Sequence, residues 1–159
     1  TEFIVVKGKG FSSSTKAGLK KATKEDVHEV VDYDYSCFGA SRRKLLEPIL
    51  LNPNNLCYIE IEDGQISGYV VAKVYEEMAE IGPLVCSQGR GNIAIDLLRA
   101  VLSRLEGFEV SMCIPKKEQA ILNMLKDAGF EEDFRVARMF FGPPFVKDCI
   151  YMAESLERG

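Results

Sequence analysis

The stretch from Leu56 to Val85 places the tightest limit on the fold of this 159-residue chain. It reads LCYIEIEDGQISGYVVAKV and, after a short charged turn, EMAEIGPLV, so three β-rich runs follow one another. Asp63-Gly64 lies between the first two runs, and Asp-Gly is a preferred pair for a hairpin turn because glycine tolerates positive φ. The sequence therefore predicts an antiparallel meander of three strands in the middle of the chain.

A glycine-containing loop follows the meander and leads into a helical pattern. Gly89, Gly91 and Ala94 spell G-x-G-x-x-A, the spacing of a dinucleotide-binding turn. That turn belongs at the first strand of a parallel βαβ array, whereas this loop follows an antiparallel meander. Glu109 has the separation of the acidic partner, but it begins its strand instead of ending it. A nicotinamide or flavin site is therefore disfavoured.

The same loop is suited to another phosphate group. The first N–H groups of a helix have no acceptor inside the helix and lie at its positive end, so they attract an anion. Glycines let the backbone approach phosphate oxygens closely, and Arg90 supplies a positive charge. A glycine-rich turn that only caps a helix has the same composition, so the loop alone leaves both interpretations open.

Gly82-Pro83 interrupts the third run of the meander. Proline has no N–H to donate to a neighbouring strand, so the strand is expected to bulge or to lose pairing at this point. An edge strand that merely tolerates proline is the alternative.

The other segments alternate between helical and strand patterns. Thr23 is a candidate N-cap, with Asp26 at the positive end, for a helix that Gly39 ends. The predicted order is strand 3–6, a Gly- and Ser-rich linker, strand 19–23, helices 24–38 and 42–51, the meander, helix 93–105, strand 108–115, helix 118–128, and strands 134–142 and 149–157. This order predicts a mixed α/β fold.

This order resembles the GNAT superfamily of acyl-CoA-dependent N-acyltransferases, over residues 19–159. The resemblance implies a mixed, mainly antiparallel sheet flanked by helices, with two central strands splayed apart. It implies acetyl-CoA as co-substrate, with its pantetheine arm in the gap beside Leu84 and Val85. Ile93 departs from the family's loop pattern, which has glycine or alanine there. The pyrophosphate loop would comprise Gln88, Gly89, Arg90, Gly91, Asn92 and Ile93.

A narrower resemblance is to a GNAT subgroup whose members often carry two GNAT domains in tandem. Its D-x-x-x-F-G-x-x-R pattern is present as Asp34, Phe38, Gly39 and Arg42, at the helix junction that borders the acceptor site. The resemblance implies that residues 1–18 are a trailing strand and linker of a preceding domain, or that the chain pairs as a homodimer. A helix stop with a packed phenylalanine is the alternative explanation for the pattern.

The resemblance also implies a catalytic arrangement. Several GNAT enzymes place a glutamate at the position of Glu80, where it acts as the general base for an amine acceptor. The usual general-acid tyrosine is missing, because Leu125 stands there. Two functions stay open: an N-acetyltransferase that acts on a small-molecule or peptide amine, and a non-catalytic acyl-CoA-binding domain that serves regulation or domain packing.

Composition limits the other classes of function. The net charge of −4 does not suit a basic nucleic-acid-binding surface. The five cysteines are widely spaced and His28 is the only histidine, so no disulfide framework and no metal site are expected. The sequence has no apolar run of 18 residues and no signal-peptide pattern, which predicts a cytoplasmic protein that does not enter a membrane.

Overall fold

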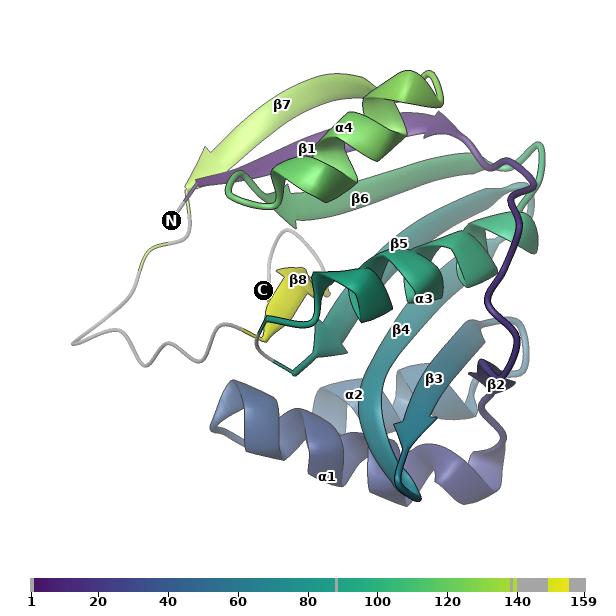
Figure 1. The fold of residues 1–159 in the computed structure, drawn as a ribbon, viewed down its shortest axis with the longest axis vertical. Helices are drawn as coiled ribbons and strands as arrows, with labels where there is room; N and C mark the ends of the chain where they lie inside the picture. Colours follow the sequence, from purple (N-terminus) through teal and green to yellow (C-terminus); the bar gives the residue numbers. More distant parts are fainter. Residues whose placement is uncertain (1, 88, 138, 140–148, 155–159) are drawn as a thin grey trace.

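The computed structural model describes residues 2–87, 89–137, 139 and 149–154. Its centre is a mixed sheet with the strand order β2-β3-β4-β5-β6-β1-β7, and β8 pairs with β5 (Figure 1). The strands are β1 (Glu2–Lys9), β2 (Lys20–Lys21), β3 (Leu56–Glu62), β4 (Gln65–Tyr75), β5 (Met78–Cys86), β6 (Glu109–Pro115), β7 (Glu131–Ala137) and β8 (Ile150–Met152). The helices are α1 (Val27–Phe38), α2 (Arg43–Leu51), α3 (Gly91–Ser103) and α4 (Gln119–Asp127), with a 3-10 turn at Lys24–Asp26 before α1.

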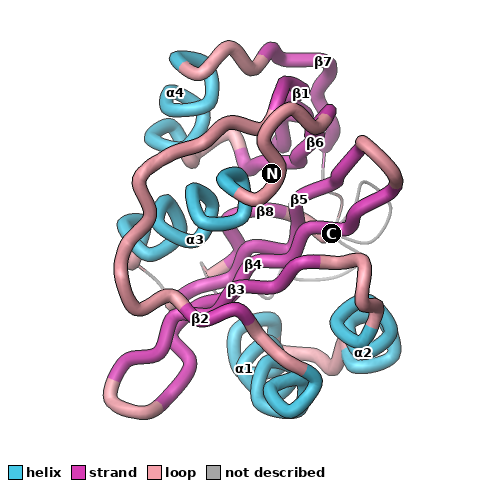
Figure 2. Tube along the Cα trace, turned by 90° about the vertical axis from the view of Figure 1, so that its right-hand side faces the viewer, coloured by secondary structure: helices cyan, strands magenta, loops and turns pink. Residues whose placement is uncertain are grey.

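The helices lie on both faces of the sheet. Figure 2 shows α1 and α2 on one side of β3 and β4, with α3 on the other. The larger core packs α3 and α4 against the sheet through Leu97, Val101 and Leu125, all of them fully buried. A smaller core joins α1 to the opposite face through Val30 and Tyr69. This confirms the predicted mixed, mainly antiparallel sheet flanked by helices.

The meander forms as its turn residues predict. β3 and β4 are antiparallel and so are β4 and β5. Asp63 and Gly64 both have positive φ, 51° and 75°, which is the geometry of the tight hairpin turn that matches the twist of the strands. The α1 end is confirmed as well, because Gly39 adopts φ 84° as the left-handed C-cap and its N–H donates to the Tyr35 carbonyl.

The first residues of the predicted helix form a 3-10 turn instead of α-helix. Thr23 is the N-cap of the 3-10 turn, and its N–H donates to the Asp26 carboxylate at 2.8 Å. This capping box stabilises the start of the 3-10 turn, and the α-helix begins directly after the turn, at Val27. Pro48 lies inside α2 without ending it.

Two strands at the centre of the sheet diverge. β5 and β6 pair in parallel only from Met78 to Ile81. The pairing of β4 with β5 then shifts, because Val70 lies opposite Leu84 whereas Ala72 lies opposite Ile81. Gly82-Pro83 is therefore a bulge, as predicted, and it marks the point where β5 leaves β6.

The first strand of the chain is an inner strand of the same sheet. β1 lies between β6 and β7 and is antiparallel to both (Figure 1). Gly10 follows it at a close contact, since a Cβ there would lie 1.9 Å from the Leu105 carbonyl oxygen. The domain boundary predicted between residues 18 and 19 stays a prediction, whereas the sheet in this structure includes Glu2–Lys9.

Candidate functional site

The loop from Ser87 to Arg90 presents backbone to open space. Gly89 has φ 76°, and the Arg90 N–H donates to the Ser87 carbonyl, which turns the chain into α3. A Cβ on Gly89 or Gly91 would meet nothing within 4 Å. Gly91 and Asn92 begin α3, so helix geometry leaves their N–H groups without an intrahelical acceptor. The described part of the loop is thus open to a ligand. Gln88 lies outside the described residues.

Two other loop residues are already committed to contacts within the chain. The Arg90 guanidinium donates two hydrogen bonds to the Glu62 carboxylate at the end of β3, one of them at 3.0 Å. These bonds raise the pKa of Arg90 and share its charge with Glu62. The Ile93 side chain is buried in the core and its N–H donates to the Arg90 carbonyl. Arg90 and Ile93 thus have partners within the chain, and an anion at this loop would be met mainly by the N–H groups of Gly91 and Asn92.

The backbone beyond the Gly82-Pro83 bulge is paired with the last strand of the chain. Leu84 lies opposite Met152 and Val85 opposite Ile150, and the Cys86 N–H donates to the Cys149 carbonyl at 3.0 Å. The sequence prediction left Leu84 and Val85 free for a pantetheine arm. In this structure β8 contacts them, and a ligand can pair with them only where β8 is absent.

Glu80 lies on β5 just before the bulge. Its neighbour Ile81 points into the core under α3, so the Glu80 side chain points to the face that carries α1. The side chain is 38% exposed, and one carboxylate oxygen lies 3.3 Å from the Lys73 ammonium of β4. Glu80 is therefore accessible to solvent and has a charged neighbour at the point where β5 and β6 separate.

Lys73 joins Glu80 to the C-terminal segment. Its ammonium donates to the Glu154 carboxylate at 2.7 Å and to the Glu154 carbonyl at 2.8 Å. Both side chains are buried, and the second carboxylate oxygen of Glu154 has no hydrogen-bond partner in the part of the chain that the structure describes. Sequence reasoning missed this cluster. A lysine inside the apolar run VVAKV was the available signal, because a buried lysine needs a partner.

The predicted acceptor residues pair with one another. Arg42 donates to both carboxylate oxygens of Asp34, at 3.0 Å and 2.6 Å, and the Tyr69 hydroxyl donates to the same carboxylate at 2.6 Å. The Arg42 guanidinium lies over the Phe38 ring, 4.1 Å from its centroid. Asp34 is fully buried, and so is Tyr69. The burial of Tyr69 and the negative charge of the Asp34 carboxylate together raise the pKa of Tyr69 well above its usual value. This cluster joins α1, α2 and β4.

An opening remains beside this cluster. A cavity of about 450 Å³ lies at the junction of α1 and α2, lined by Phe38, Ser41, Arg42, Lys44 and Leu45. Phe38 and Arg42 therefore border an open space, whereas Asp34 lies beneath them with its charge balanced by Arg42. Tyr69 was not predicted for this site, because nothing in the β4 pattern distinguishes it from a core residue.

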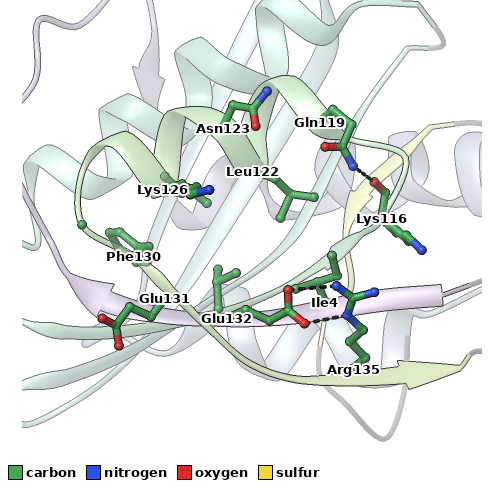
Figure 3. A pocket seen from close by; sticks show the side chains of 13 residues that line it. Ile4, Lys116, Gln119, Leu122, Asn123, Lys126, Phe130, Glu131, Glu132 and Arg135 are labelled. Carbon is green, nitrogen blue, oxygen red and sulfur yellow. Dashed lines mark hydrogen bonds and ion pairs between the residues drawn. The ribbon is translucent and has the colours of Figure 1, made fainter.

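A larger hollow lies elsewhere on the molecule. Its volume is about 630 Å³, and it lies between α4 and the strands β1 and β7 (Figure 3). Ile4, Leu122 and Phe130 line its apolar part, and Arg135 and Glu132 form an ion pair at its edge. Neither Glu80 nor any described residue of the 84–93 stretch lines it.

Three further observations limit the possible functions. Leu125 is fully buried in the main core, so it offers no proton donor where many GNAT enzymes have a tyrosine. Within the described ranges, no group of three or more His, Cys, Asp or Glu side chains is arranged to hold a metal ion. The described helices are all too short or too polar to cross a membrane.

Known proteins similar in sequence to this chain are described as acyltransferases. The chain is 26% identical over 145 residues to the holothin acyltransferase of a Pseudoalteromonas species, which is 89% of this chain and 49% of that protein. It is 20% identical over 131 residues to the uncharacterized N-acetyltransferase YitH of Bacillus subtilis, 82% of this chain and 45% of that protein. The chain thus spans about half the length of these two curated relatives.

A solved structure shows the same fold. A GNAT-family protein from Novosphingobium aromaticivorans matches 84% of this chain and 61% of its own, with a TM-score of 0.61 at 14% identity.

The family model described as acetyltransferase (GNAT) domain matches residues 30–151. The match covers most of the chain, from α1 to β8, and the chain therefore belongs to the GNAT acetyltransferase family.

Proposed function

We propose that this protein is an N-acetyltransferase that transfers the acetyl group of acetyl-CoA to the nitrogen of an amine. The observation that carries the proposal is the open backbone at Gly89 and Gly91, where α3 begins directly after β5. Converging N–H groups at a helix start favour a pyrophosphate, and the missing side chains leave it room. Asn92, the next residue of α3, is exposed and extends the same surface.

The reaction needs a group that accepts the proton of the amine. The amine nitrogen forms a bond to the thioester carbon, the carbon–sulfur bond breaks, and the coenzyme leaves as its thiolate. Glu80 would take the proton of the amine through a water molecule, since it is half-exposed and lies at the splayed end of β5. Because Leu125 cannot donate a proton, the thiolate would leave unassisted, and we expect slow turnover.

A second function is favoured by one observation. β8 is seated against Leu84 and Val85, the positions that a pantetheine arm would use. A domain whose arm site is permanently filled would not turn over acyl-CoA and would serve regulation or domain packing. The chain spans about half the length of these two relatives, so a preceding GNAT domain belongs to the proposal as well. A homodimer and a cytoplasmic location, both expected from the sequence, are further parts of the proposal.

Calorimetric titration with acetyl-CoA tests the binding site. We expect Gly91→Ala to lower the affinity at least tenfold, because the added methyl group faces the open space that the pyrophosphate would fill. The substitution suits a helix, so stability should be kept. Arg99→Ala is the control, since it lies on the same helix roughly 12 Å further along and should leave the affinity unchanged. Equal affinities for both variants would contradict the proposed site.

A further inference from the structure

The segment around β8 lies in the gap between β5 and β6 and is hydrogen-bonded to both strands. On one side Leu84 and Val85 of β5 pair with it, and on the other the Ala153 N–H donates to the Cys113 carbonyl of β6 at 3.0 Å. The fit is close, because a Cβ on Gly82 would lie 2.0 Å from the Ala153 carbonyl oxygen. β8 therefore uses the backbone groups that the divergence of β5 and β6 exposes.

A buried ion pair holds this strand in place. Glu154 follows β8, and its carboxylate and its carbonyl oxygen both accept hydrogen bonds from the Lys73 ammonium. Lys73 comes from β4, so the contact connects the residue that follows Ala153 after β8 to the centre of the sheet. The Glu154 side chain is only 2% exposed.

The attachment has two weak points. β8 is only three residues long, so few backbone hydrogen bonds secure it. Among the described residues, the second oxygen of the buried Glu154 carboxylate has no hydrogen-bond partner, and an unpaired buried oxygen destabilises this position of β8. Met152 is fully buried there and favours it. The balance of these effects is one that a ligand with its own apolar and amide groups can shift.

We propose that β8 competes with the pantetheine arm of acyl-CoA for the backbone of β5, and that the Lys73–Glu154 ion pair holds β8 in its position. The inference rests on the proposed function. A pantetheine arm carries two amide groups on an extended chain, so it offers Leu84 and Val85 the same kind of partner that β8 offers. Binding of acyl-CoA then requires β8 to leave the gap, which also frees Lys73 from Glu154.

Amide hydrogen exchange over residues 149–154, with and without acetyl-CoA, tests the competition directly. We expect exchange there to speed up when acetyl-CoA is added, while residues 87–93 become more protected. This sign is informative, because a ligand that simply covers a surface slows exchange. Binding of acetyl-CoA with unchanged or slower exchange at 149–154 would overturn the inference and leave the proposed function standing.

A variant that breaks the Lys73–Glu154 ion pair gives a second measurement. Glu154→Gln removes the charge that Lys73 pairs with and keeps the shape of the side chain, so β8 should leave more easily and acetyl-CoA should bind three- to tenfold more tightly. Glu109→Gln is the control, since its pair with Lys9 is exposed, and its affinity should equal that of the unmodified protein. Unchanged affinity of Glu154→Gln would overturn the role of the ion pair. No acetyl-CoA binding by any of the three proteins would overturn the proposed function and the inference with it.

Discussion

At the scale of single residues, Glu80 carries the proposed chemistry. Glu80→Gln should lower the rate of acetyl transfer at pH 7 by roughly 10²-fold, because the amine then has no group to take its proton. The loss should shrink as the pH rises, since more of the amine is already neutral. Affinity for acetyl-CoA should change little, because Glu80 lies on the α1 face, away from the loop, and the Glu154 carboxylate and carbonyl still bind Lys73. Steady-state kinetics across pH would measure this.

The control for this variant is Glu77→Gln in the turn before β5, which should keep the full rate. If Glu80→Gln turned over as fast as the control at every pH, Glu80 would be a strand residue with no part in proton transfer.

Asp34 is predicted to border the acceptor, and that role stays a prediction. In the structure it is fully buried and paired with Arg42. Asp34→Asn should lower the free energy of unfolding by about 3–5 kcal/mol, because it leaves a buried guanidinium without its counter-charge. Asp32→Asn, on the same helix with its side chain 60% exposed, should cost about 1 kcal/mol or less. Urea unfolding of both variants would show it, and similar costs for the two would contradict the structural role.

At the scale of elements, an ion pair between the end of β3 and the start of α3 bears on the ligand. Glu62 shares the charge of Arg90 and adds a negative charge beside the phosphate loop. Glu62→Gln should therefore strengthen acetyl-CoA binding roughly two- to fivefold, the equivalent of one exposed ion pair. The gain should fade at high salt, because exposed charges are screened.

Titration at two salt concentrations would measure this, with Glu131→Gln on β7 as the control for a change in net charge. Weaker binding by Glu62→Gln would show that the loop needs this carboxylate, contrary to the proposed anion site.

Elements set by neighbouring residues could be predicted from the sequence. The hairpin follows from Asp63-Gly64, the end of α1 from Gly39, and the bulge in β5 from Gly82-Pro83. The helix after the glycine loop also follows from the local pattern, although α3 begins at Gly91, two residues before the predicted start. In each case the determining residues lie within a few positions of the feature, so local backbone chemistry is enough.

Pairings over long sequence separations could not be predicted. The apolar run in β1 indicates a strand but not its place between β6 and β7. The same holds for Lys73 and Glu154, which are 81 positions apart. A strand pattern specifies which side chains share a face, whereas neighbours in the sheet are chosen by the packing of the whole chain. The cofactor and acceptor residues stay predictions, and the sequence could not supply the partners of Glu80 and Asp34.

At the scale of the whole molecule, the first and last strands of the chain determine how the sheet is completed. β1 occupies the inner position between β6 and β7, and β8 occupies the gap between β5 and β6 (Figure 1). The gap beside the Gly82-Pro83 bulge is the place where acyl-CoA and the chain itself would compete. Whether the family membership extends to catalysis thus depends on an equilibrium of the entire fold, and not on the loop alone.

One measurement tests the central claim most directly: turnover of acetyl-CoA with a panel of amines, followed by release of the coenzyme thiol and by the mass of the amine. The account predicts slow, saturable thiol release that requires an amine and equals the amount of acetylated amine formed. Thiol release at the rate of uncatalysed hydrolysis with every amine, by a protein that binds acetyl-CoA, would contradict it and favour a non-catalytic acyl-CoA-binding domain.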